Sequence, residues 1–99
     1  MPDLPDFSPL ESYLDAEGRL ARWPSVKKKN RAMTDLALEY LVQAFEYDRV
    51  YTEREVNALL NEHHTFEDAA LLRREMVMYG LMAREIDGSA YWRTDPDDH

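Results

Sequence analysis

The stretch LLRREMVMYGLMAREIDGSAYWR, residues 71–93, decides the expected fold because it joins a helix to a β-hairpin. Its first part has apolar residues at the three- and four-residue spacing of a helix up to Tyr79. Gly80 then supplies the left-handed residue that ends many helices. Two short β-prone runs follow, and between them lies Asp87-Gly88, the dipeptide that a type I′ turn prefers. The stretch therefore predicts a helix followed directly by a hairpin.

The expected hairpin has a definite register but two candidate inner faces. A two-residue loop would place Ile86 opposite Ser89. The next pairs would be Arg84 with Tyr91 and Ala83 with Trp92. One face would carry Ala83, Ala90 and Trp92, and the other Met82, Ile86 and Tyr91. We expect the face with Trp92 to be buried because a small-large-small cluster packs well, although the second face is also apolar.

Upstream residues carry the start signals of three helices. Ser25 is a candidate N-cap for a long helix that would run to about Phe45. The sequence TERE, residues 52–55, is a capping box that would begin a short second helix. Thr65, with Asp68 three residues further on, would cap a third helix in the same way. Two short helices joined by a short turn have helix-turn-helix geometry.

The order of these elements predicts the fold class. Val50-Tyr51 is β-prone and would form a short strand beside the hairpin. The chain would then run as a long helix, a short strand, two tandem helices and a β-hairpin wing. We therefore expect a small α+β domain that is winged-helix-like.

The net charge of −8 lies in the two ends of the chain. Residues 1–18 contain five acids and no base, and residues 94–99 contain three more acids. The stretch between them is neutral, with twelve bases and twelve acids. We expect an acidic N-terminal arm over 1–18 that is mobile or loosely docked, a single domain over 19–93, and a disordered acidic tail over 94–99.

The composition restricts the classes of function. Because the chain has no cysteine, disulfides and thiol chemistry are excluded, and a reducing compartment suits it. No Ser-His-Asp pattern, glycine-rich phosphate loop or nucleophile elbow is present, so we expect neither an enzyme nor a cofactor. No secretory signal and no apolar run of roughly 20 residues is present, so we expect a cytoplasmic protein without a membrane partner. His63-His64 is interpreted as a surface turn, and no metal site is expected.

A cluster of bases favours contact with nucleic acid. Six bases lie between Arg19 and Arg31 with no acid among them. Three of them, the lysines at 27–29, lie near the expected helix start, where the helix dipole disfavours positive charge. Phosphate groups would offset this charge, and so would the acidic arm. The candidate nucleic-acid-binding residues are Lys27, Lys28, Lys29, Arg31, Arg73, Arg74, Arg84 and Arg93.

The outer face of the third helix is mostly apolar, which favours a protein contact. If Leu72 and Met76 face the core, Leu71, Val77 and Met78 lie on the opposite side. Either the N-terminal arm covers this face, or a second protein does. In the second case Leu71, Val77 and Met78 are the candidate interface residues, and the partner would be a second copy of the chain or a regulator protein.

Four runs of the chain, GRLARWP, KKK, RVYTEREVNALL and LLRREMVMYGLMAREIDGSAYWR, resemble a known family. It is a bacterial domain-of-unknown-function family, number two thousand and eighty-seven, and the resemblance spans residues 18–93. Its members occur alone or joined to helix-turn-helix regulators of the ArsR and MerR types, which implies transcriptional regulation. We therefore expect a non-enzymatic, transcription-associated module that contacts DNA through phosphates. The alternative is a protein-interaction or homodimerisation module without direct DNA binding.

Overall fold

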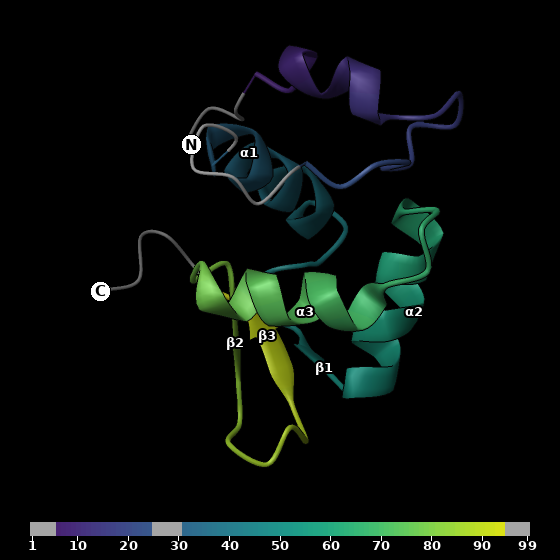
Figure 1. The fold of residues 1–99 in the computed structure, drawn as a ribbon. Helices are drawn as coiled ribbons and strands as arrows, with labels where there is room; N and C mark the ends of the chain where they lie inside the picture. Colours follow the sequence, from purple (N-terminus) through teal and green to yellow (C-terminus); the bar gives the residue numbers. More distant parts are fainter. Residues whose placement is uncertain (1–5, 25–30, 95–99) are drawn as a thin grey trace.

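The computed structural model describes residues 6–24 and 31–94 of the chain. The elements, labelled in Figure 1, are the 3-10 helix η1 (Ser8–Tyr13), the helices α1 (Arg31–Val42), α2 (Glu53–His63) and α3 (Ala69–Met78), and the strands β1 (Val50–Tyr51), β2 (Met82–Arg84) and β3 (Tyr91–Arg93). The protein is a small α+β domain, as predicted. The order of α1, β1, α2, α3 and the β2–β3 hairpin is also the predicted one.

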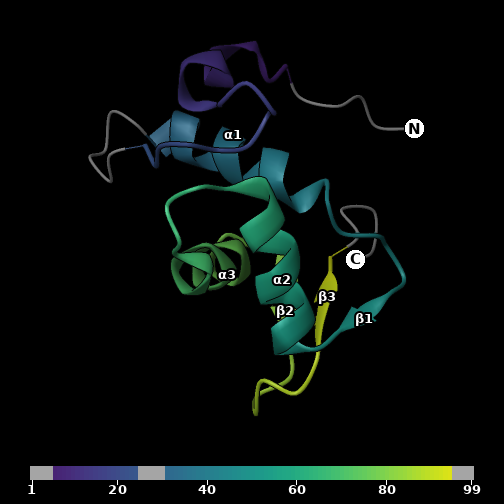
Figure 2. The ribbon, with the colours of Figure 1, turned by 90° about the vertical axis from the view of Figure 1, so that its right-hand side faces the viewer.

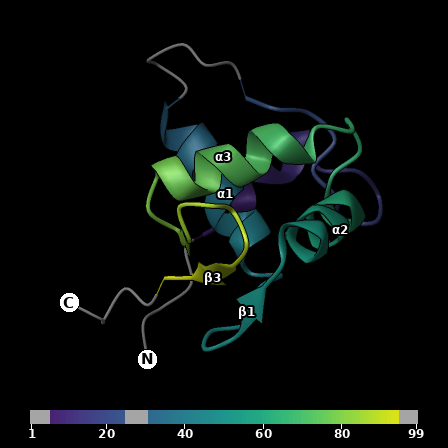
Figure 3. The ribbon, with the colours of Figure 1, turned by 90° about the horizontal axis from the view of Figure 1, so that it is seen from below.

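The three strands form one antiparallel sheet in the order β1-β3-β2. Seen from below, β3 lies beside β1, and β1 leads directly into α2 (Figure 3). The prediction that β1 is the third strand is confirmed, since Val50 pairs with Trp92. The predicted hairpin register is confirmed as well, since Arg84 pairs with Tyr91 and Ala83 with Trp92.

The turn of the hairpin differs from the expected type I′ turn. The carbonyl of Glu85 accepts a hydrogen bond from the Gly88 N–H at 2.9 Å, and the Glu85 N–H donates to the Ala90 carbonyl at 2.9 Å. The loop therefore covers residues 86–89. Gly88 has a φ of 76°, whereas Asp87 does not have the positive φ that a type I′ turn requires. The longer loop adds one residue on each side of the expected turn, so the register is unchanged.

The buried face of the hairpin is the opposite of the expected one. Met82 and Tyr91 are buried in the core, while Ala83 and Trp92 are only half-buried. The reason is the packing of α3 against β2 (Figure 1), because Met82 joins Met76 of α3 in the buried core. Ile86 shares the strand parity of Met82, but it lies in the loop beyond α3 and is 97% exposed.

The start of α2 is the predicted capping box. The Glu55 N–H donates to Thr52 Oγ1 at 3.1 Å, and the Thr52 N–H donates to Glu55 Oε1 at 2.9 Å. The predicted cap of α3 at Thr65 is wrong, because the N-cap is Asp68, whose carboxylate accepts the Leu71 N–H at 3.2 Å. Glu67 has a φ of 54°, which breaks the helical backbone just before this cap.

The long first helix is shorter than predicted at its C-terminal end. It ends at Val42 instead of about Phe45, and the proposed N-cap Ser25 lies outside the described residues. Phe45 is nevertheless buried, and its carbonyl accepts a hydrogen bond from Arg93 Nη1 at 3.1 Å. A residue of β3 thus supplies a hydrogen-bond partner for this carbonyl after the end of α1.

The core lies between the three α-helices and the inner face of the sheet, with α1 packed across the other two helices (Figure 2). The buried hydrophobic residues are Leu10, Leu20, Ala37, Leu38, Leu41, Val42, Phe45, Tyr51, Val56, Leu60, Ala69, Leu72, Met76, Met82 and Tyr91. Every described helix and strand contributes to this set, so the domain has one continuous core.

The described part of the N-terminal arm, residues 6–18, is docked, whereas a mobile or loosely docked segment was expected. Its described part forms η1, which packs on the side of α1 away from α3 (Figure 1). Leu10 of η1 is fully buried. Phe7 meets Tyr40 of α1 edge to face, with ring centroids 5.2 Å apart. Buried apolar area of this kind is sufficient to hold a short acidic segment in place.

Leu20, just after this arm, pairs through its backbone with the junction of α2 and α3. It forms an antiparallel bridge with Leu14 and a parallel bridge with His64. The Leu20 N–H donates to the His63 carbonyl at 2.8 Å, and the Leu20 carbonyl accepts the Thr65 N–H at 3.0 Å. The run around Leu20 is therefore part of the folded domain.

Candidate functional site

Three of the arginines predicted to bind nucleic acid line one hollow of about 350 Å³ between α3 and the hairpin. They are Arg73 and Arg74 of α3 and Arg84 of β2. The remaining lining residues are Glu53, Val77, Met78 and Tyr91. We call this feature the arginine hollow. Because three bases face one acid, it has a local excess of positive charge within a chain that is acidic overall.

Arg73 is held in place by two residues of α2. Its Nη2 lies 3.2 Å from Glu53 Oε1, and its Nη1 donates a short hydrogen bond to Asn57 Oδ1. The Tyr91 hydroxyl donates to the same Glu53 oxygen at 3.4 Å. The Arg73 side chain is only 19% exposed, so its guanidinium is a fixed part of the wall.

Arg74 and Arg84 form the accessible rim of the arginine hollow. Both residues are exposed. Arg84 Nη1 lies 3.4 Å from the Glu85 carbonyl and 3.3 Å from the Ile86 carbonyl, which orients its side chain along its own hairpin. Guanidinium groups at such positions can bind a phosphate or carboxylate through two parallel hydrogen bonds.

The other predicted nucleic-acid contacts do not join this hollow. The guanidinium carbon of Arg31 lies 5.8 Å from the centre of the Tyr79 ring, at the start of α1. The guanidinium carbon of Arg93 lies 4.0 Å from the centre of the Tyr47 ring. Arg93 lines a second hollow, and no other arginine of the predicted set lines it. The three predicted lysine contacts, Lys27, Lys28 and Lys29, lie outside the described residues.

The predicted protein-contact residues are less exposed than expected, except for one. Leu71 and Val77 are half-buried, and Val77 packs against the core. Met78 is 70% exposed and lines the arginine hollow together with Val77. The docked arm covers α1 and not this face of α3 (Figure 1). The expected apolar surface is thus reduced to Met78 and its immediate surroundings.

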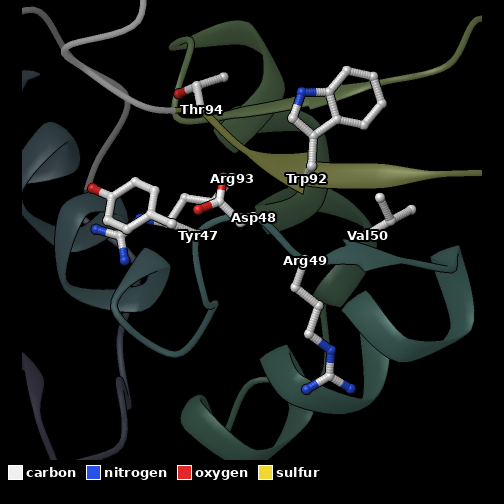
Figure 4. A pocket seen from close by; sticks show the side chains of 7 residues that line it. All are labelled: Tyr47, Asp48, Arg49, Val50, Trp92, Arg93 and Thr94. Carbon is white, nitrogen blue, oxygen red and sulfur yellow. The ribbon is translucent and has the colours of Figure 1, made fainter.

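A second hollow of about 420 Å³ lies on the outer face of the sheet (Figure 4). Its lining residues are Tyr47, Asp48, Arg49, Val50, Trp92, Arg93 and Thr94. Val50 and Trp92 are paired across β1 and β3, their side chains stand on the same side of the sheet, and Val50 is 65% exposed. Sequence reasoning missed this surface because it placed Trp92 in the core; the β-prone Arg49-Val50-Tyr51 run was the signal that could have indicated it.

His64 is a buried structural residue and not part of a surface turn. Its Nε2 accepts the Asp68 N–H at 2.9 Å, and its Nδ1 donates to the Leu60 carbonyl at 2.5 Å. Both ring nitrogens are thus occupied by backbone groups. Within residues 6–24 and 31–94, no cluster of three or more histidine or acidic side chains is placed to hold a metal ion. In the same ranges, no helix has the length and apolar character needed to cross a membrane.

Several carboxyl groups have a pKa below the usual range because they accept hydrogen bonds in turns and caps. The backbone N–H of Arg19 lowers the pKa of Asp15, and the backbone N–H of Thr52 lowers the pKa of Glu55. These shifts belong to local backbone structure. The hydrogen bonds that cause them stabilise the turn at Asp15 and the start of α2.

Comparison with known proteins places the chain in a family without assigning an activity. No curated protein and no solved structure matches it significantly. One family model matches residues 19–93, which are most of the chain and contain α1 to α3 and the whole sheet. The chain therefore belongs to the bacterial family described as "Uncharacterized protein conserved in bacteria (DUF2087)".

Proposed function

We propose that this domain is a non-enzymatic regulatory module that contacts the phosphates of nucleic acid through the arginine hollow. The observation that supports it is the convergence of Arg73 and Arg74 of α3 and Arg84 of β2 on one accessible site. The site lies between the last helix and the hairpin. In a winged-helix protein these positions correspond to the recognition helix and the wing.

The side chains favour phosphate contact over base readout. Guanidinium groups bind phosphate oxygens without regard to sequence, and such contacts position a protein on the duplex. The exposed end of α3 offers Met78 and Arg74 but few of the amide side chains that read base edges. We therefore expect binding that is weak and largely independent of sequence.

The tip of the hairpin limits the contact surface. Ile86 is almost fully exposed there, and Glu85 and Asp87 flank it with negative charge. These acids would repel phosphate, so the contact would be confined to the arginine hollow. Neutralising two or three phosphates gives a slope of about −2 to −3 for log affinity against log salt concentration.

The test is a titration of a labelled mixed-sequence DNA duplex, followed by fluorescence anisotropy from about 50 mM to about 200 mM salt. Arg74→Ala and Arg84→Ala should each weaken binding and reduce the salt slope by about one. Arg54→Ala removes the same charge from an exposed position of α2 that does not line the hollow, and it should leave binding unchanged. DNA binding that Arg74→Ala and Arg84→Ala leave unchanged, or that all three substitutions weaken equally, would refute the proposal.

A protein-interaction or homodimerisation module is the second candidate. Its support is the exposure of Met78 beside the hollow and of Val50 on the outer sheet face. Sedimentation of the purified chain over a range of concentrations tests self-association. A dimer that Met78→Ser dissociates, in a chain that does not bind DNA, would replace the first proposal by this one.

A further inference from the structure

We infer that the carboxylate of Glu53 occupies the phosphate seat of the arginine hollow in the free protein and competes with an incoming phosphate. This inference rests on the proposed function and identifies the residue that sets the affinity of the site. The seat is defined by two donors that converge on Glu53 Oε1. They are Arg73 Nη2 at 3.2 Å and the Tyr91 hydroxyl at 3.4 Å.

The two partners of this ion pair differ in exposure, and the more exposed side chain is the one that can move away from the other. The Glu53 side chain is 51% exposed, whereas that of Arg73 is 19% exposed. An exposed ion pair of this kind contributes little to stability, so the carboxylate can rotate into solvent at small cost. The guanidinium stays behind as part of the wall.

Asn57 keeps Arg73 in position when Glu53 is absent. Glu53 and Asn57 are four residues apart and therefore lie on the same face of α2. The amide oxygen of Asn57 accepts the second hydrogen bond of the guanidinium without neutralising its charge. When the Glu53 carboxylate is removed, the Arg73 guanidinium therefore stays in position, and its positive charge has no acidic partner in the hollow.

The start of α2 does not depend on Glu53. The capping box uses Thr52 and Glu55, and its two hydrogen bonds remain when Glu53 is replaced. Glu53→Gln therefore removes the charge of the competing group from a folded helix. Apart from the ion pair with Arg73, it loses only the small favourable interaction of one acid with the helix N-terminus.

An incoming phosphate would take over the two donors of Glu53 and meet Arg74 and Arg84 at the rim. Glu53→Gln should consequently bind the DNA duplex about three- to fivefold more tightly than the unmodified chain at about 50 mM salt. The gain should shrink toward about 200 mM salt, because the exposed carboxylate is screened.

The matched control is Glu62→Gln. It makes the same charge change on the same helix, at an exposed position about 13 Å further along the axis. It should change the affinity by less than about 1.5-fold, because the attraction or repulsion of two exposed charges is already weak at this distance in water. Equal gains in the two variants would reduce the effect to net charge and overturn the inference.

A double variant tests the route of the effect. In an Arg73→Gln background, Glu53→Gln should give no gain, because the positive charge that it uncovers is missing. A gain that persists there overturns the inference. Thermal unfolding of each variant shows whether it is folded. If Arg73→Gln does not fold, the comparison of Glu53→Gln with Glu62→Gln alone tests the inference.

The experiment separates the failure of this inference from that of the proposed function. If Arg74→Ala and Arg84→Ala weaken DNA binding but Glu53→Gln does not strengthen it, the inference is wrong and the proposed function stands. Titration with inorganic phosphate distinguishes the source of the anion. If Glu53→Gln binds inorganic phosphate more tightly and no variant binds DNA, the competition by Glu53 is supported and the nucleic-acid function is refuted.

Discussion

Replacing His64 with alanine should strongly destabilise the domain. The imidazole joins the last turn of α2 to the cap of α3, because Nδ1 donates to the Leu60 carbonyl and Nε2 accepts the Asp68 N–H. The Leu60 carbonyl is one of the four that a helix leaves without a partner at its C-terminal end. Alanine can satisfy neither backbone group.

The magnitude follows from the burial of the two groups. Leaving a buried donor or acceptor without a partner costs about 1–3 kcal/mol. Water can reach the cap at Asp68, which is exposed, so the larger part of the loss comes from the Leu60 carbonyl. The edge contact of the imidazole with Phe66, at 4.6 Å between ring centroids, is lost as well. We expect a decrease of about 3 kcal/mol in the free energy of unfolding, a large share of the roughly 5–15 kcal/mol of a typical domain.

The assay is urea unfolding followed by circular dichroism, with His63→Ala as the matched control. His63 is the adjacent histidine, and its carbonyl, which alanine retains, makes the bond to Leu20. His63→Ala should therefore cost less than about 1 kcal/mol. A similarly small cost for His64→Ala, or equal costs for the two variants, would refute the assignment of His64 as a structural residue.

Three further measurements test other parts of the fold. Leu10→Ala should lower the free energy of unfolding by about 2–4 kcal/mol in the same urea assay, whereas an undocked arm would give almost no change. Because the pKa of Asp15 is lowered in the fold, the ionised carboxylate stabilises the protein at neutral pH, and this stabilisation is lost as the pH falls below about 4. Asp15→Asn should therefore reduce the drop in melting temperature between about pH 6 and about pH 3. An unchanged drop would contradict this. Gly88→Ala should lower the free energy of unfolding by about 1 kcal/mol in thermal unfolding, because Gly88 has a φ of 76°, which strains a residue with a Cβ. The nearest atom to an added Cβ is 4.0 Å away, so no steric clash is expected. A larger cost would indicate such a clash.

The parts of the fold that could be predicted are those set by neighbouring residues. The capping box at Thr52 uses two side chains three residues apart, so it can be identified without knowledge of the rest of the fold. The register of the hairpin depends only on the centre of its loop. The loop is longer than expected, so the predicted pair of Ile86 and Ser89 is lost, but its centre is at Asp87-Gly88 as predicted and the pairs of Arg84 with Tyr91 and Ala83 with Trp92 are preserved.

The buried face of the hairpin could not be predicted, because it depends on tertiary structure. Both faces carry apolar residues, and the choice between Tyr91 and Trp92 is made by the side on which α3 packs. The docking of the arm is a similar case. Its acidic composition indicated solvent exposure, but the burial of Leu10 and the contact of Phe7 with Tyr40 hold η1 on α1.

The candidate site was predicted only in part. Arg73, Arg74 and Arg84 were identified from their charge, but their convergence depends on how α3 crosses the hairpin. Glu53 and Asn57 were missed because nothing local to α2 indicates that it faces Arg73. Sequence reasoning identifies charged groups, whereas the ion pairs among them require the packing of the helices.

The double pairing of Leu20 has a consequence for where this domain can be cut. The family similarity begins at residue 19, yet Leu14, one of the two residues that bridge to Leu20, lies before that boundary. The same holds for Leu10, which is fully buried in the core. A fragment that started at residue 19 would lose this part of the core and one side of the Leu20 pairing. Fusion or truncation designs should therefore retain the chain from Phe7 onward as one physical unit.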